Sequence, residues 1–94
     1  MENTGIWSDT DIRLIDIFVS SLVKVTNPPP HVKNLKMDIF SSGRDFKLAN
    51  IGLESLAILE LCINLEFDHS IVLSPENYLS FISVNDLLRG MSIR

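Results

Sequence analysis

The sequence contains a single cysteine, Cys62, among its 94 residues. One cysteine excludes an internal disulfide and leaves no set of thiolates for zinc or an iron–sulfur centre. His31 and His69 lie far from Cys62 and from each other in the sequence, without the short spacing of metal ligands. We therefore expect no structural metal, and we expect Cys62, in its apolar segment, to be a small buried hydrophobe rather than a reactive thiol.

Glycine and proline are also scarce, with four of each, while 46% of the residues are hydrophobic. This composition excludes fibrous and disordered classes and, at this length, predicts one compact domain over residues 1–94. No apolar run approaches the about 18 residues that span a bilayer. Charged residues also interrupt the N-terminal segment where a secretion signal needs an unbroken apolar stretch. We expect a cytoplasmic, stand-alone protein that starts at Met1.

Basic residues are missing from much of the second half of the chain. Residues 1–53 contain six acids and six bases, whereas residues 54–86 contain six acids and neither lysine nor arginine. Nucleic-acid binding requires clustered lysine and arginine, so this pattern disfavours it. The pattern favours partners with basic patches, although a merely solvated acidic face would look the same. The six acids are Glu54, Glu60, Glu66, Asp68, Glu76 and Asp86.

Helix signals occur in four places, and strand signals are absent. Ser8 with Asp11 has the spacing of a capping box and precedes apolar residues at three- and four-residue intervals, which predicts a helix over residues 9–25. Ser74 followed by Pro75 predicts a short helix over 75–80. Ser83 with Asp86 predicts a last helix over 84–89, closed by Gly90.

The fourth helix is predicted over residues 55–67, and its apolar residues form two stripes at 100° per residue. One stripe suffices to dock a helix into a core, and a domain this small has little interior to bury a second. The second stripe is therefore a candidate contact surface, or alternatively it packs under the long connection over residues 27–53. The expected core stripe is Ile58, Leu61, Cys62 and Leu65, and the second stripe is Leu56, Leu59, Ile63 and Phe67.

Three segments carry a resemblance to a known family. Residues 52–56, Gly-Leu-Glu-Ser-Leu, resemble the Gly-x-Asp-Ser-Leu signature of acyl carrier proteins, with Glu54 in place of the aspartate. The similarity continues through the helix, through residues 73–76 and into residues 81–88, which resemble the run that opens the last helix of these carriers. The resemblance implies an all-α, four-helix bundle of acyl-carrier type with a long first loop and a short third helix.

The same resemblance implies a function, which is to hold an acyl intermediate as a thioester on a 4'-phosphopantetheine arm attached to Ser55. It implies a specialised carrier in lipid, polyketide or related biosynthesis and not an enzyme. The implied partners are a phosphopantetheinyl transferase and acyl-activating, synthase or acyltransferase enzymes, which would meet a monomeric carrier. The expected partner-binding residues are Glu54, Leu56, Leu59, Glu60 and Ile63.

Two alternatives stay open at this point. On the helix pattern alone, Ser55 is more simply an N-cap, which is the commonest role of serine before an apolar helix. The chain would then be an unmodified helical interaction module with a carrier-like fold. Glu54 favours that alternative, because it is one methylene longer than aspartate and is a poorer cap.

Overall fold

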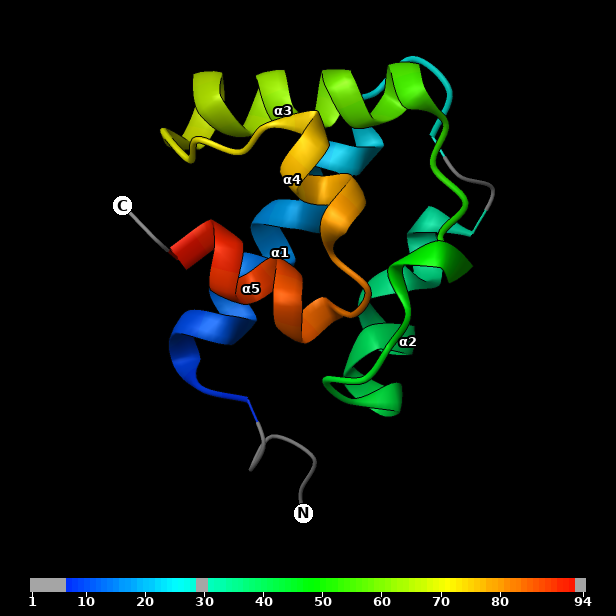
Figure 1. Cartoon of the computed structure of the whole chain (residues 1–94). Coiled ribbons are helices and arrows are strands. Elements are labelled where there is room, and N and C mark those ends of the chain that lie inside the picture. Colours follow the sequence, from blue (N-terminus) through cyan, green and yellow to red (C-terminus); the bar gives the residue numbers. More distant parts are fainter. Residues whose placement is uncertain (1–6, 29–30, 93–94) are drawn as a thin grey trace.

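The computed structural model describes residues 7–28 and 31–92, and within them the chain is mostly helical without strands (Figure 1). The all-α expectation is therefore confirmed at the level of class. The described part contains five α-helices rather than the four expected, together with one turn of 3-10 helix. In chain order these elements are α1 Asp9–Val23, α2 Val32–Ser42, η2 Leu48–Asn50, α3 Ser55–His69, α4 Pro75–Ser80 and α5 Val84–Ser92.

The helix starts follow from local capping, as the sequence predicted. At α1, the Asp11 amide donates to Ser8 Oγ at 3.0 Å and the Ser8 amide donates to the Asp11 carboxylate at 3.2 Å. At α4, the Asn77 amide donates to Ser74 Oγ at 3.0 Å. At α5, the Asp86 amide donates to Ser83 Oγ at 3.4 Å. Each cap satisfies amides that the first turn of a helix leaves without an intrahelical acceptor.

The helix ends differ from the sequence predictions. α1 ends at Val23 and not at residue 25, because the amides of Lys24 and Val25 bond to carbonyls three residues back and tighten the chain. Of the prolines expected to end it, Pro29 and Pro30 lie outside the described residues. α3 continues past residue 67 to His69 and ends at Ser70, whose φ of 58° is left-handed.

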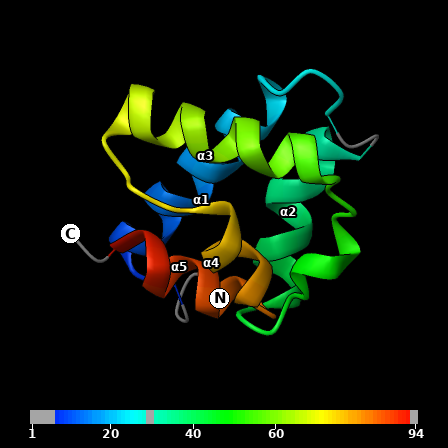
Figure 2. The same ribbon diagram turned by 45° about the horizontal axis from the view of Figure 1, so that its top comes forward.

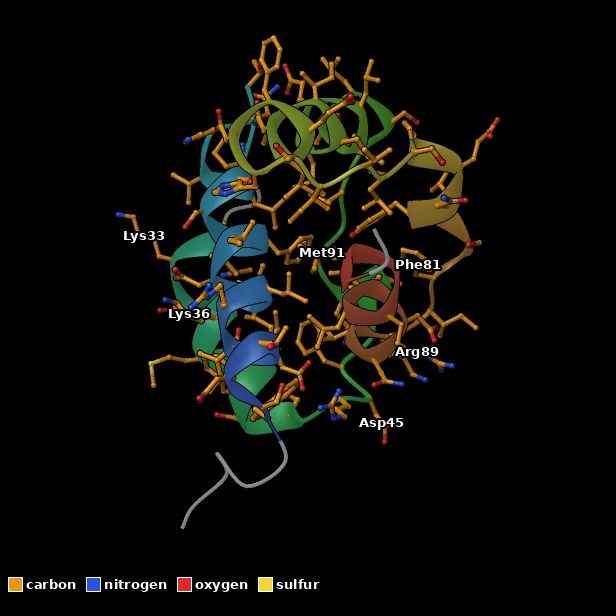
Figure 3. All side chains as sticks on the ribbon, turned by 90° about the vertical axis from the view of Figure 1, so that its left-hand side faces the viewer. Lys33, Lys36, Asp45, Phe81, Arg89 and Met91 are labelled. Carbon is orange, nitrogen blue, oxygen red and sulfur yellow. The ribbon has the colours of Figure 1, made fainter. Side chains whose placement is uncertain are left out.

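Gly90 lies within α5 and does not close it, so its predicted role was wrong. A Cβ atom built on Gly90 would lie 2.5 Å from Cζ of Phe81. Figure 3 shows Phe81 beside α5, and Met91 lies on the side of α5 toward α1. The glycine therefore permits the close approach of an aromatic ring. Sequence spacing alone does not distinguish this role from that of a helix cap.

The connection over residues 27–53 was expected to be a long loop with at most a short helix or turn at Leu35, Met37, Ile39 and Phe40. It instead contains the 11-residue helix α2. Val32, Leu35 and Ile39 share one face of α2 and are buried, and Lys36 forms an ion pair with Asp16 of α1 at 2.6 Å. The N-cap residue His31 makes no side-chain cap hydrogen bond. Tertiary burial thus stabilises a helix that lacks a local start signal.

Gly43 ends α2 in a backbone conformation that side chains rarely adopt, with φ 91° and ψ −171°. This region is essentially restricted to glycine, and other residues held there cost about 1–3 kcal/mol. We expect Gly43→Ala to lower the free energy of unfolding by about that amount in urea titrations. The matched control is Ser42→Ala at the exposed neighbour. Equal stability of the two variants would contradict the assigned conformation.

The core lies where α1 packs against α2, α3 and α5, while α4 packs against α3 (Figures 1 and 2). Phe18, Leu22, Ile39, Leu61 and Leu65 are completely buried within it. α3 crosses one end of this assembly, so that one of its sides faces the core and the other faces solvent.

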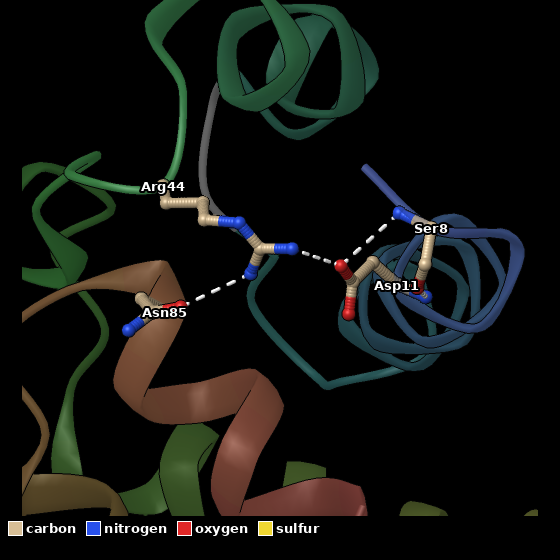
Figure 4. Close-up of polar contacts among 4 residues, drawn as sticks. All are labelled: Ser8, Asp11, Arg44 and Asn85. Atoms are coloured by element: carbon tan, nitrogen blue, oxygen red, sulfur yellow. Dashed lines mark hydrogen bonds and ion pairs between the residues drawn. The ribbon is translucent and has the colours of Figure 1, made fainter. Parts of the chain in front are cut away.

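Arg44 connects the first turn of α1 to the start of α5 (Figure 4). Its guanidinium bonds to the carboxylate of Asp11 and donates to Oδ1 of Asn85 at 3.0 Å. The guanidinium carbon also lies 5.2 Å from the ring centroid of Trp7, which packs edge-to-face on Phe40 of α2. These contacts fix the entry to α1 and the start of α5 without involving Ser55.

Candidate functional site

α3 has the two faces that the sequence predicted. Ile58, Leu61, Cys62 and Leu65 are all buried. On the other face, Leu56 is 57% exposed, Leu59 45%, Ile63 49% and Phe67 87%, so these side chains do not pack under the connection before the helix. We call the four exposed residues the α3 stripe. An exposed apolar row on one helix is a feature of surfaces that bind partners.

Ser55 is exposed and occupies the first position of α3. The N-cap position falls on Glu54, whose side chain makes no cap hydrogen bond. The alternative role of Ser55 as the N-cap therefore does not fit the geometry. A hydroxyl at the first helical position is accessible, and it lies beside the unpaired amides and positive dipole end that favour an anion.

Gly52 makes the turn that leads into this position. Its φ is 74°, and a Cβ atom there would meet nothing within 4 Å, so backbone conformation rather than space requires glycine. Glu54 then runs extended, with φ −82° and ψ 166°, and its carbonyl accepts the amide of Ile58 at 3.0 Å. The turn thus presents Ser55 and Leu56 at the exposed start of the helix.

Glu60, an expected partner-binding residue, has an internal contact that the sequence did not reveal. Its carboxylate accepts the Thr26 hydroxyl at 2.6 Å and the Thr26 amide at 2.9 Å. The hydroxyl first, and then the amide, lower the pKa of Glu60 below its ordinary value. Glu60 therefore fixes the segment after α1 against α3, in addition to any role at a partner surface.

A pH-dependent effect follows from this contact. Because the folded-state pKa of Glu60 lies below its unfolded value, its stabilising contribution is present above the ordinary pKa of 4.5 and is lost as pH falls through the folded-state pKa. We expect Glu60→Gln to be less stable than the parent near neutral pH, and the difference to shrink below pH 4.5. Urea unfolding at both conditions measures it. Glu66→Gln, at an exposed position of the same helix, should show no such convergence.

The acidic side chains of residues 54–86 do not form a uniformly negative, solvated face, because several of them bond to other parts of the protein. Asp68 pairs with Lys24, the C-cap residue of α1, at 2.9 Å, and Asp86 accepts the amides of Ile82 and Ser83 at the start of α5. Asn64 donates to the Ser21 carbonyl at 3.5 Å. Residues 60, 64 and 68 are spaced one helical turn apart. They thus form a row of polar contacts from α3 to the end of α1 and the segment after it.

Two cavities lie on either side of the turn before Ser55, and Gly52 and Leu53 line both. One, of about 220 Å³, is apolar and lies between η2, Ile58, Leu79 and Phe81. The other, of about 260 Å³, lies between residues 26–28, the turn 52–54 and the first turns of α3. We call them the apolar cavity and the Thr26 groove.

Cys62 is buried under α3, and burial raises the pKa of its thiol to about 11. We expect the thiol of the folded, unmodified protein to resist alkylation at neutral pH, because the reactive thiolate is scarce and inaccessible. The same protein unfolded in urea should label fully, and this provides the internal control. Rapid stoichiometric labelling of the folded chain would contradict the assignment of the buried face.

Sequence reasoning missed Thr26, Lys24 and Asn64, which connect the site to α1. Their partners lie more than 30 positions away in the sequence, so no local pattern marks them. The four-residue spacing of Glu60, Asn64 and Asp68 was the one available signal, because it places three polar residues on one side of an otherwise apolar helix.

Searches of protein-family models, curated proteins and solved structures found no match to this chain. Across residues 7–28 and 31–92, no group of three or more His, Cys, Asp or Glu side chains lies close enough to bind a metal ion. In the same described residues, no helix has the length and hydrophobicity needed to cross a membrane.

Proposed function

We propose that this protein is an acyl carrier whose Ser55 bears a 4'-phosphopantetheine arm. The observation that carries the proposal is the exposed hydroxyl of Ser55 at the first position of α3, directly after the Gly52 turn and beside the α3 stripe. The family resemblance of residues 52–56, 73–76 and 81–88 supports it. An acyl-carrier type of bundle, here with the additional helix α2, belongs to the same proposal.

The residues around Ser55 fit such a group. The first amides of α3 and its dipole favour the negative charge of a phosphodiester. In the attachment step, a bond forms between Ser55 Oγ and phosphorus, and the pyrophosphate bond of coenzyme A breaks. The serine proton passes to a base and 3',5'-ADP leaves. When attached, the group supplies a thiol that carries acyl chains as thioesters.

The α3 stripe supports the choice of partners. A phosphopantetheinyl transferase and the acyl-activating, synthase or acyltransferase enzymes must all approach Ser55, and the stripe begins at the adjacent Leu56. Leu59 and Ile63 continue it along the helix, and Glu54 flanks Ser55 on the other side. In this proposal the protein is a cytoplasmic monomer that presents a tethered substrate and performs no catalysis itself. Tethering raises the effective concentration of the acyl group at each enzyme.

The second candidate is an unmodified interaction module that uses the same stripe. Glu54 favours it, because the family signature has aspartate there and Glu54 makes no cap contact. The intact mass of the chain after coexpression with a broad-specificity phosphopantetheinyl transferase distinguishes the two candidates. We expect a gain equal to one phosphopantetheine. An unchanged mass, with a known carrier modified in parallel, would favour the interaction module.

A further inference from the structure

The Thr26 groove approaches Ser55 without including it. Both neighbours of Ser55, Glu54 and Leu56, line the groove, and its opposite wall is the segment Thr26–Pro28 that follows α1. The hydrogen bonds from Thr26 to Glu60 hold that wall against α3, so the groove does not depend on a ligand for its shape.

The groove has a mixed chemistry. Leu53, Leu56 and Pro28 supply apolar surface, the side chain of Asn27 supplies an amide, and Glu54 and Glu60 supply carboxylates. Within residues 7–28 and 31–92, no hydrogen bond engages that amide, which can both donate and accept. Tyr78 lines the apolar cavity, and its hydroxyl is buried and has no hydrogen-bond partner among the described residues.

We propose that the Thr26 groove docks the pantetheine part of the arm when no acyl group is attached. This inference rests on the proposed function. Pantetheine alternates secondary amides with methylene and methyl groups, which matches a groove where the Asn27 amide and the carboxylates of Glu54 and Glu60 stand beside apolar side chains. Because the ligand is tethered beside the groove, its effective concentration is high and a few weak contacts suffice.

The test begins with the protein modified on Ser55, confirmed by intact mass, and compares its amide NMR spectrum with that of the unmodified protein. We expect shift changes at Thr26, Asn27 and Gly52, and proton–proton contacts between the pantetheine methyl groups and Leu56. Asn27→Ala should remove the changes at Thr26 and raise the alkylation rate of the arm thiol by about two- to tenfold, the worth of one hydrogen bond. Asn34→Ala, an exposed asparagine of α2 outside the groove, is the matched control.

The outcomes separate this inference from the proposed function. A mass gain with shift changes confined to residues next to Ser55 would overturn the docking and leave the carrier function standing. Contacts from the arm to Leu79 or Phe81 would also overturn it, because they would place the arm in the apolar cavity. Failure of the chain to gain mass would overturn both.

Discussion

Replacement of Ser55 by alanine is expected to abolish attachment of phosphopantetheine while leaving the domain folded. The chain would lose its one hydroxyl at the start of α3, and no other side chain of that turn carries a nucleophile. The effect on stability should be small, because Ser55 lies at the first helical position and not at the cap. We expect a change in unfolding free energy within about 0.5 kcal/mol, which is usual for exposed positions away from special contacts.

Ser20→Ala is the matched control, because Ser20 is an exposed serine of α1. That variant should gain the full mass of the group and unfold like the parent. If Ser55→Ala were modified as fully as the parent, Ser55 would not be the attachment site. If it unfolded instead, the serine would have a structural role that its exposure does not explain.

The second large effect is a difference in stability between alanine variants of two leucines on opposite faces of α3. Leu61 is completely buried, and Leu61→Ala should lower the free energy of unfolding by about 2–5 kcal/mol through lost burial and the cavity left behind. Leu59 is 45% exposed, and Leu59→Ala should change stability by only about 0.5 kcal/mol. Urea titrations of both variants measure the difference.

For partner binding, by contrast, the exposed residues of α3 should matter most. We expect Leu59→Ala and Ile63→Ala to weaken binding to the cognate transferase or synthase by about fivefold or more, the range of contacts that exceed 1 kcal/mol. Glu60→Gln should cost less, because the Glu60 carboxylate already accepts two hydrogen bonds from Thr26. Added salt should have a weak effect on an interface formed mainly by apolar contact. If Glu60→Gln cost most and salt abolished binding, charge would be the main determinant.

The parts of the fold that could be predicted are those with local causes. Ser8 with Asp11 and Ser74 with Pro75 specify helix starts within four residues, and both are capped as expected. The two stripes of α3 follow from the period of the helix alone. Their assignment to core and solvent was also correct, because a small domain has room to bury only one of them.

The parts that could not be predicted depend on contacts distant in sequence. α2 begins without a side-chain cap, and its burial against α1 stabilises it. The bond from Thr26 to Glu60 joins residues 34 positions apart, so the second role of Glu60 is invisible in the sequence. The sequence predicted that Gly90 ends a helix. The structure instead explains the glycine by the ring of Phe81, which leaves no room for a Cβ atom.

The central claim is that Ser55 is the site of attachment, and peptide mapping of the modified chain tests it most directly. The protein is incubated with coenzyme A and a broad-specificity transferase, digested, and its fragments sequenced by mass spectrometry. We expect the added phosphopantetheine on the fragment that contains residues 52–56, with the fragment series placing it on Ser55. Attachment to any other residue, or an unmodified fragment while a control carrier is converted completely, would contradict the account.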